Sequence, residues 1–310
     1  MRFFHKFKSI NYEFQGLVNG ILLNCKKKTQ YTRALEYLEK YSYALNNITY
    51  QETSEKYPNK IWQLWLQGAE NMPAIVKRCH NSVKKYYGND VVLLTKDNLK
   101  DYIQLPDYIE EKYAKGIISH ANYSDMVRLM LLAKYGGCWV DSTTYLTAKI
   151  PEDILNANFF TFKSVNSENL KFLKSIEQFK IFSNHINRTI DIESPYFIRA
   201  KAENIIINSI LNLFLEYWKH ENTLFDYLMI DKCFNLVVLS NQECKQEFLN
   251  MPTYYLENVL LLQDALFEKF DENLFNNIKA ITPVHKLTYK NLHRNPYKDS
   301  FLQYLLDGKI

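Results

Sequence analysis

The sequence predicts one α/β domain with helical additions at its two ends. Two observations predict it: a strand–helix–strand pattern over residues 60–95, and a long helix that runs into a short strand over 119–141. A chain of 310 residues with 47% hydrophobic content can bury a large core. No repeat or linker divides the chain, but its character changes at Pro58, so we expect a helical extension over 1–57, the main domain over 58–290 and a C-terminal tail over 291–310.

The first unit of the domain is a parallel β-α-β arrangement. Residues 60–66 form a short apolar run that is closed by Gln67 and Gly68, and Pro73 then opens a helix. Gly88 ends this helix, and a second apolar run follows over residues 90–95. Continuous apolar runs of this length are typical of parallel strands that are buried on both faces.

The next unit is a helix followed by a strand that ends in a carboxylate. After two short helices around Pro106, an apolar face along residues 119–134 predicts one strong helix, which Gly136 and its neighbour stop. Residues 138–140 then form a short strand that leads into Asp141. Ligands of open α/β sheets collect beyond the carboxyl ends of strands, so Asp141 is a candidate functional residue.

The remaining segments are expected to complete the sheet and to form a further lobe beside it. An extension helix is clearest over residues 31–45. Further strands are expected near 159–165, 195–199 and 281–287, with helices over 202–218, 225–238 and 254–278.

Charge and cysteine usage limit the class of protein. The net charge of +4 is spread along the chain rather than gathered in a basic arm, so nucleic acid is not the expected partner. The five cysteines form no C-x-x-C pair, and an odd number in a chain of this length is a poor disulfide framework, which favours a reducing cytoplasm.

The N-terminus leaves two interpretations open. It has no secretory signal, and its most apolar stretch falls short of the roughly 20 residues that cross a bilayer, so the protein is expected to be soluble or peripheral to a membrane. Phe3, Phe4, Phe7 and Ile10 stand at helical spacing among basic residues, which suits either an interfacial anchor or a helix that packs on the domain.

Asp125 and Arg128 are the clearest candidate pair of functional residues. They lie three residues apart on the predicted 119–134 helix and therefore project from the same face. A carboxylate beside a guanidinium suits sugar hydroxyls, because one accepts hydrogen bonds and the other donates them. The spacing alone favours an ordinary ion pair on a helix surface.

The context of this pair resembles the core motif of the DXD-type sugar transferase family, which includes capsular polysaccharide synthesis proteins, fungal mannosyltransferases and glucosylating clostridial toxins. The shared pattern is S-D-x-x-R, then L-x-x-x-G-G, then an apolar strand that ends in D-x-D, and here it runs from Ser124 to Thr143. A second block, Ile61–Gly68 followed by Pro73, is similar to the family's first nucleotide-binding strand. Residues 105–109, 226–227 and 284–289 are similar to the capsular branch and extend the resemblance over about residues 58–290.

The resemblance implies a GT-A fold, a Rossmann-type mixed sheet with a nucleotide-sugar at its strand ends. Asp125 and Arg128 match the positions that grip the donor sugar. Asp141 matches the first Asp of D-x-D and is expected to act in catalysis and to contact a metal. Trp65 matches an aromatic residue that stacks on the nucleotide base, although a tryptophan of the core is an equal interpretation, and Gln67 of the same block is expected to bind substrate.

One departure from the family concerns the metal. Thr143 replaces the second Asp of D-x-D, so a divalent cation, Mn²⁺ or Mg²⁺, is expected to bind weakly without a nucleotide. His285 and Lys286 are expected to stabilise the departing diphosphate, unless they are surface charge at a strand end.

Two further carboxylates are candidates in the second half. Asp226 is expected to bind substrate and Asp231 to act in catalysis, by facing the acceptor or supporting the reacting sugar, unless both lie on a solvated helix face.

The expected activity is transfer of a hexosyl unit from a nucleoside-diphosphate sugar to a growing bacterial surface glycan of capsular or lipopolysaccharide type, with retention. The acceptor is a glycan or a lipid-linked oligosaccharide, so the expected location is the cytoplasm, with peripheral contact at the inner face of the membrane. Two alternatives remain: a sugar-phosphate transferase, and a non-catalytic relative that only binds glycans.

Overall fold

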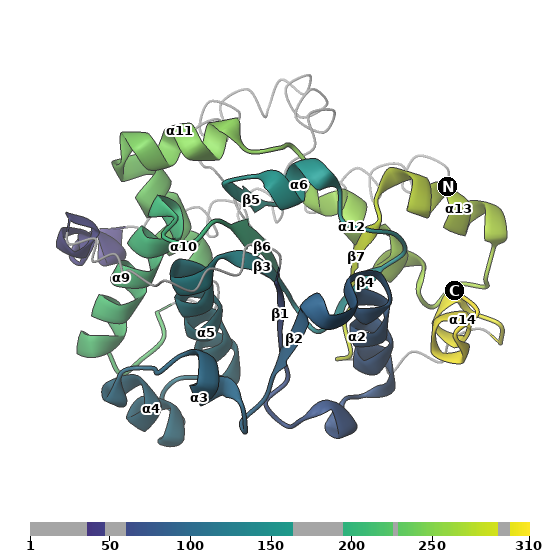
Figure 1. The fold of residues 1–310 in the computed structure, drawn as a ribbon, viewed down its shortest axis with the longest axis horizontal. Coiled ribbons are helices and arrows are strands. Elements are labelled where there is room, and N and C mark those ends of the chain that lie inside the picture. Colours follow the sequence, from purple (N-terminus) through teal and green to yellow (C-terminus); the bar gives the residue numbers. More distant parts are fainter. Residues whose placement is uncertain (1–35, 47–59, 164–194, 226–228, 291–297) are drawn as a thin grey trace, which may run out of the picture.

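The computed structural model describes residues 36–46, 60–163, 195–225, 229–290 and 298–310. These residues form a layered α/β structure in which helices lie on both sides of a central sheet (Figure 1). In the view of Figure 1, α5 (His120–Tyr135) and α9 (Ile205–His220) lie on one side of the sheet, and α2 (Ala74–Tyr87) and α14 (Phe301–Asp307) lie on the other. The predicted α/β class is confirmed.

The central sheet is mixed and has the strand order β2-β1-β3-β6-β5. Strand β1 pairs in parallel with β2 and β3, while β6 is antiparallel to both β3 and β5. The parallel part has all its carboxyl ends at one edge, which is where ligands are expected. The strands are β1 (Ile61–Leu64), β2 (Val91–Leu94), β3 (Gly137–Val140), β5 (Phe159–Thr161) and β6 (Phe197–Ala200).

A second, two-stranded sheet pairs β4 (Thr144–Leu146) with β7 (Val284–Lys286). The strands are antiparallel and place Thr144 opposite Lys286. Strand β7 confirms the expected final strand, whereas β4 is not among the strands that the sequence predicts. This pairing brings a basic residue from the end of the domain next to the carboxyl end of β3.

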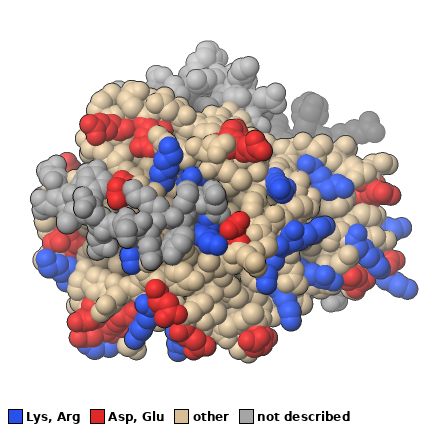
Figure 2. Space-filling model, viewed as in Figure 1, with Lys and Arg blue, Asp and Glu red and all other residues tan. Residues whose placement is uncertain are grey.

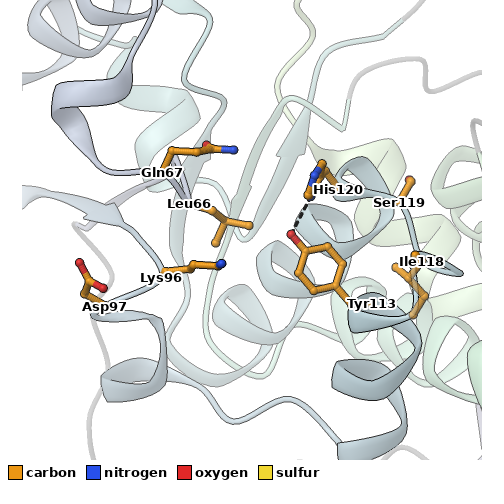
Figure 3. Close-up of a pocket in the computed structure, with 9 residues that line it drawn as sticks. Leu66, Gln67, Lys96, Asp97, Tyr113, Ile118, Ser119 and His120 are labelled. Atoms are coloured by element: carbon orange, nitrogen blue, oxygen red, sulfur yellow. Dashed lines mark hydrogen bonds between the residues drawn. The ribbon is translucent and has the colours of Figure 1, made fainter.

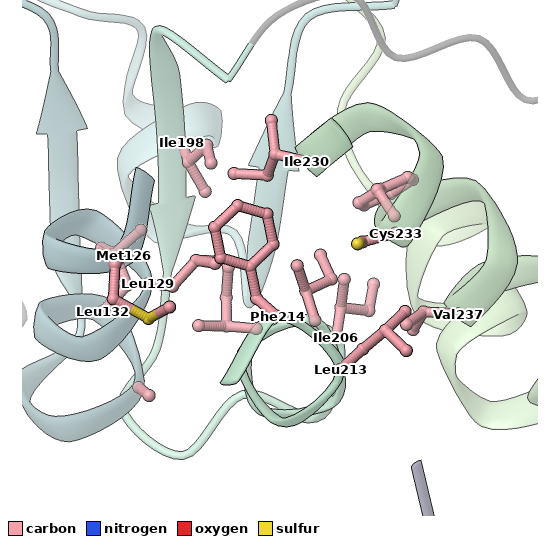
Figure 4. Close-up of a cluster of buried hydrophobic side chains, with 14 of the residues drawn as sticks. Met126, Leu129, Leu132, Ile198, Ile206, Leu213, Phe214, Ile230, Cys233 and Val237 are labelled. Carbon is pink, nitrogen blue, oxygen red and sulfur yellow. The ribbon is translucent and has the colours of Figure 1, made fainter. Parts of the chain in front are cut away.

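Helix α5 (His120–Tyr135) is the buried helix that the sequence predicts. The Ser119 hydroxyl accepts a hydrogen bond from the Asn122 backbone N–H and caps its first turn, and Gly136 ends it. Apolar side chains of α5 pack against α9 (Ile205–His220) and α10 (Met229–Ser240), which form the largest hydrophobic cluster (Figure 4). Polar residues on so buried a helix need partners, which matters for Asp125 and Arg128.

Other helices follow the sequence signals closely. Pro73 precedes α2 and Gly88 ends it, and Pro106 separates α3 from α4, as expected. Residues 36–39 of the expected 31–45 helix are helical, while the aromatic residues of the N-terminus lie outside the described residues. The remaining helices are α2 (Ala74–Tyr87), α3 (Leu99–Tyr102), α4 (Asp107–Ala114), α6 (Glu152–Asn156), α11 (Gln242–Asn250), α12 (Leu256–Ala265) and α13 (Glu272–Ile281), with 3₁₀ turns at Ser42–Asn46, Ala69–Asn71 and Gly88–Asp90.

The C-terminal residues pack into the domain rather than standing apart as a tail. Helix α14 (Phe301–Asp307) buries Phe301 and Leu305 completely in a cluster that also holds residues of α2 and α13. The Arg78 guanidinium of α2 donates to the Leu306 carbonyl oxygen at 2.6 and 2.9 Å. Among the described residues, no helix has the length and apolar content needed to span a membrane.

Gly136 is expected to be intolerant of substitution, because it combines a φ of 71° with a close neighbour. A Cβ at Gly136 would lie 2.5 Å from the backbone nitrogen of Ala202, which follows β6. We expect Gly136→Ala to lower the free energy of unfolding by about 3 kcal/mol or more, measured by denaturant titration. Gly88→Ala is the matched control, since Gly88 also ends a helix at positive φ but its Cβ would meet nothing within 4 Å. An equal loss in both variants would rule out the close approach as the cause.

Candidate active site at the carboxyl edge of the sheet

Asp125, Arg128 and Asp141 meet where β3 ends. The Arg128 guanidinium lies 3.3 Å from an Asp125 carboxylate oxygen and 3.4 Å from Asp141 Oδ1. The side chains of Asp125 and Arg128 are almost fully buried, while about a quarter (26%) of the Asp141 side chain is exposed. The fold thus brings these three candidate residues together, and the pair on α5 is a buried ion pair rather than an ordinary surface pair.

Lys286 completes a chain of alternating charge. Its ammonium lies 3.0 Å from Asp141 Oδ2 and also donates to the Thr143 hydroxyl. The two residues that occupy the first and third positions of the D-x-D motif are therefore joined by a lysine. The cluster runs Asp125, Arg128, Asp141, Lys286, and we call it the charge cluster.

Aromatic residues and backbone hold the charge cluster in place. The Trp139 indole donates to Asp141 Oδ1 at 2.8 Å, and the Arg128 guanidinium lies 5.0 Å from the Trp139 ring centroid. Lys286 Nζ lies 5.1 Å from the ring centroid of Tyr196, whose carbonyl accepts from the Asp141 backbone N–H at 2.8 Å. The sequence did not predict that Trp139 and Tyr196 support the charge cluster, because the sequence pattern around each is that of an ordinary aromatic residue of the core.

The two aspartates have opposite pKa shifts. Burial raises the pKa of Asp125 to about 6, and the Arg128 charge offsets this only in part. Burial also raises the pKa of Asp141, but Lys286, Arg128 and the Trp139 hydrogen bond outweigh it, so this carboxyl ionises below its usual range. At neutral pH Asp141 is therefore a firmly held anion within hydrogen-bond reach of two cations.

The raised pKa of Asp125 predicts a pH-dependent loss of stability. Because the folded-state pKa of about 6 exceeds the usual 3.8, this group stabilises the fold below about pH 4, and the contribution is lost as the pH rises through 6. The free energy of unfolding of wild type, minus that of Asp125→Asn, is expected to fall by up to about 3 kcal/mol between pH 4 and 7. Urea titrations of both proteins across this range measure it, and a difference that does not vary with pH would contradict it.

A cavity of about 720 Å³ opens at the carboxyl ends of β1 and β2 (Figure 3). Leu66 and Gln67 follow β1, and Lys96 and Asp97 follow β2. The wall opposite them in Figure 3 comes from α4 and the start of α5, where Tyr113 and His120 share a hydrogen bond of 2.6 Å. Gln67, which is predicted to bind substrate, lines this cavity, and so do Lys96, Tyr113 and His120, which were not predicted.

The cavity and the charge cluster stand side by side along the strand ends. Strand β1 lies between β2 and β3, and the Ser142 hydroxyl donates to the Leu64 carbonyl at 2.6 Å, which ties the loop after β3 to the end of β1. Neighbouring strands are about 4.8 Å apart. An elongated ligand can therefore extend from the cavity toward Asp141.

Trp65 and His285 do not join the charge cluster. Trp65 is partly buried and meets Tyr289 edge to face, with ring centroids 5.6 Å apart. His285 is fully buried and its Nε2 lies 3.0 Å from the Thr147 hydroxyl. Burial lowers the pKa of His285 to about 4, so it carries no charge at neutral pH that could stabilise a diphosphate.

The candidates on the 225–238 helix are only partly described. Asp231 is buried on α10 and lines a narrow cavity together with Leu129 of α5 and Pro195, so it does not lie on a solvated face. Asp226 lies outside the described residues.

The fold and the charge cluster define an α/β protein with a group of buried charges and a cavity at the carboxyl edge of its sheet. Comparison with known protein families identifies the family of this chain. The chain belongs to the capsular polysaccharide synthesis protein family, whose model matches residues 19–305. The resemblance that the sequence motifs indicated is thereby confirmed.

Individual relatives are distant. An uncharacterized glycosyltransferase of Acanthamoeba polyphaga mimivirus is 27% identical over 43% of this chain and 49% of its own length. The O-glycosyltransferase PaGT of Phomopsis amygdali is 29% identical over 30% of this chain and 25% of its own length. The chain thus spans half or less of these curated relatives. Among solved structures, the PaToxG glycosyltransferase matches 72% of this chain and 84% of its own, with 13% identity and a TM-score of 0.36.

Proposed function

We propose that this protein is a GT-A-type glycosyltransferase that moves a hexosyl unit from a nucleoside-diphosphate sugar to a growing surface glycan, with retention of anomeric configuration. The bond between the anomeric carbon and the diphosphate oxygen breaks, and its electron pair leaves on the diphosphate. A bond from an acceptor hydroxyl oxygen to the anomeric carbon forms, and the hydroxyl proton is released to solvent. The charge cluster at the end of β3 is the observation that carries this proposal.

We assign a part of the proposed donor to each region. The 720 Å³ cavity at the ends of β1 and β2 takes the nucleoside, with Gln67 and Lys96 as polar contacts. The sugar then lies toward Asp125 and Arg128, which offer a hydrogen-bond acceptor and a rigid donor fork. Asp141 orients Arg128 and Lys286 through its two oxygens, which are 3.4 and 3.0 Å from these cations.

Lys286 supplies positive charge where the donor must release negative charge. A fixed ammonium in a partly buried site stabilises a departing diphosphate more strongly than it would in water. Asp141 and Thr143 hold this ammonium in a defined place, so no reorganisation is needed during the reaction. His285, being buried and neutral, takes no part in this step.

The residues at the charge cluster do not fit a divalent cation as they lie. Such a cation needs about six oxygen ligands, and it favours more than one carboxylate. Of the two Asp141 oxygens, Oδ1 already accepts from Trp139 and Oδ2 from Lys286. Among the described residues, no group of three or more His, Cys, Asp or Glu side chains is arranged to hold a metal. The ammonium of Lys286 lies where a cation would bridge the first and third motif positions.

Metal binding without nucleotide is therefore expected to be very weak, and two substitutions should create it. Thr143→Asp restores the second carboxylate, and Lys286→Ala removes the competing ammonium. We expect the double variant to bind Mn²⁺ at least about tenfold more tightly than either single variant, measured by calorimetric titration of the nucleotide-free proteins. Tight binding of Mn²⁺ by nucleotide-free wild type would show that other ligands hold a metal.

A panel of nucleoside-diphosphate sugars tests the transferase function. The protein is incubated with each sugar nucleotide, with and without an oligosaccharide acceptor, and release of nucleoside diphosphate is measured beside Asp141→Ala. Release of diphosphate by wild type but not by Asp141→Ala supports the proposal. Release of nucleoside monophosphate would indicate a sugar-phosphate transferase, and glycan binding without any release would indicate a binding protein.

The proposed acceptor also suggests where the protein acts. Sugar nucleotides are made in the cytoplasm, so we place the reaction there, on a glycan or a lipid-linked oligosaccharide at the inner face of the membrane. Fractionation of cells that express the full chain, followed by a salt wash of the membranes, would detect such a peripheral association.

A further inference from the structure

A second cavity, of about 430 Å³, lies away from the charge cluster and is lined by basic side chains. Helix α2, the end of β4, helix α13 and the residues after α14 enclose it. On the right of Figure 2, Lys and Arg side chains gather over the region where Figure 1 shows these helices. We call this cavity the basic pocket.

Four cationic side chains line the basic pocket, and no aspartate or glutamate does among the described residues. They come from three separate helical regions that fold together: Arg78, Lys85, Lys279 and Lys309. Like charges that line one cavity repel one another, so a bound anion would relieve an electrostatic cost of the free pocket.

The internal contacts of the basic pocket neutralise little of this charge. Lys309 has the only ion pair of the four with a described residue, at 3.0 Å from Asp307. Lys279 and Lys85 have aromatic neighbours instead, since their ammonium groups lie 4.7 and 5.4 Å from ring centroids of Phe275 and Tyr86. Aromatic contacts of this kind orient a cation without cancelling its charge.

Arg78 anchors the basic pocket. Two of its guanidinium nitrogens donate to the Leu306 carbonyl, so the charge is fixed at the end of α14. A Cβ at Gly308 would lie only 2.6 Å from a guanidinium nitrogen, which shows how closely the chain after α14 passes. Hydrogen bonds to the backbone therefore fix the position of this cation in the pocket.

Strand β4 connects this pocket to the charge cluster without merging the two. Thr144 at its start pairs with Lys286, while Leu146 and Thr147 at its other end line the basic pocket. The Tyr86 hydroxyl, also in the pocket lining, donates to the Thr147 carbonyl at 2.5 Å. The basic pocket is thus a separate site with its own wall.

We infer that the basic pocket binds a phosphate-bearing anion. A phosphate group offers several acceptor oxygens and as many as two negative charges, which matches several converging cations better than a single carboxylate does. The aromatic side chains of Tyr86, Tyr145 and Phe275 provide apolar faces for the group that carries the phosphate. The anion is either a free phosphate compound or the headgroup of an anionic lipid.

The experiment compares two variants of equal charge in the full chain. Lys85→Gln with Lys279→Gln removes the two lysines of the pocket that form no ion pair with a described residue. Lys77→Gln with Lys84→Gln removes two exposed lysines of α2 that do not line the pocket. Both are made in Lys286→Ala protein so that the charge cluster contributes no ammonium, and circular dichroism checks their folding.

Two ligands distinguish the sources of phosphate. Inorganic pyrophosphate is titrated by calorimetry, and vesicles with and without phosphatidylglycerol in phosphatidylcholine are tested by sedimentation. We expect at least a tenfold loss of affinity when Lys85 and Lys279 are replaced. We expect no change in affinity when Lys77 and Lys84 are replaced. Loss with pyrophosphate identifies a soluble phosphate compound, and loss with vesicles alone identifies a lipid headgroup.

Two results would overturn the inference. One is equal weakening in both variants, which would reflect net charge rather than a site. The other is binding of neither ligand by the parent protein. Because every measurement is of binding, the result does not depend on whether the protein transfers sugar.

Discussion

Replacement of Asp141 by alanine is expected to lower the rate of glycosyl transfer by about a thousandfold or more while the fold is retained. The carboxylate accepts from the Trp139 indole at 2.8 Å and lies within 3.4 Å of Arg128 and Lys286. Without it, both cations lose their fixed positions, and misplacement of catalytic groups by an ångström can cost a hundredfold each. Initial rates of diphosphate release, with circular dichroism of the same preparations, measure both parts of the prediction.

A matched control separates this effect from the loss of any ion pair. Asp90 lies 3.2 Å from Lys60 at the opposite, amino edge of the parallel strands, and Asp90→Ala removes a lysine–carboxylate pair there. This variant is expected to keep nearly full activity. Asp141→Asn should be nearly as inactive as Asp141→Ala, because the neutral amide has one acceptor oxygen and turns an NH₂ donor toward one of the two cations. Transfer at the wild-type rate by Asp141→Ala would remove the charge cluster from the mechanism.

Elements with local signals could be predicted from the sequence. The β-α-β unit is marked by apolar runs, by Pro73 at the start of α2 and by Gly88 at its end. The Ser119 cap and Gly136 stop likewise delimit α5 within one or two residues. Because Asp125 and Arg128 share a helix and Asp141 follows the next strand, their meeting followed from this local order.

Contacts that depend on distant segments could not be predicted in this way. Strand β4 has three residues, too few to show alternation, and its partner β7 is about 140 residues away along the chain. The packing of α14 on α2 is equally remote in sequence. The direct contact between Lys286 and Asp141 depends on the β4–β7 pairing, so the sequence could suggest a basic residue but not its place.

The alternation of side chains along a strand could have distinguished His285 from Lys286. His285 and Lys286 are adjacent on a strand, and adjacent strand residues point to opposite faces. Only one of the two could therefore reach the donor. Since a lysine ammonium is rarely buried and a neutral imidazole often is, the alternation favours Lys286 at the site and His285 in the interior, as the structure shows.

Lys286→Met is expected to lower kcat by about a hundredfold to a thousandfold, with little change in KM for the donor. Methionine keeps much of the length and packing of the side chain but removes the charge that stabilises the departing diphosphate, and loss of one such group typically costs this much. A separate result follows for Asp141, whose pKa is held down by Lys286 and Arg128 and should therefore rise in the variant. Steady-state kinetics with a full-length donor gives the first quantity, and an NMR titration of the carboxyl gives the second.

The choice of donor separates a chemical role of Lys286 from a structural one. With a glycosyl fluoride, the leaving group is a fluoride ion and no diphosphate charge develops, so the difference between Lys286→Met and wild type should shrink. Lys290→Met is the control, because Lys290 is exposed beside Tyr289 and pairs with no described carboxylate. If Lys286→Met were equally slow with both donors, the lysine would act by holding Asp141 and the loop after β3 in place. If it were as fast as wild type with the sugar nucleotide, the positive charge at the leaving group would have to come from elsewhere, and a divalent cation carried in by the donor would be the first candidate to test.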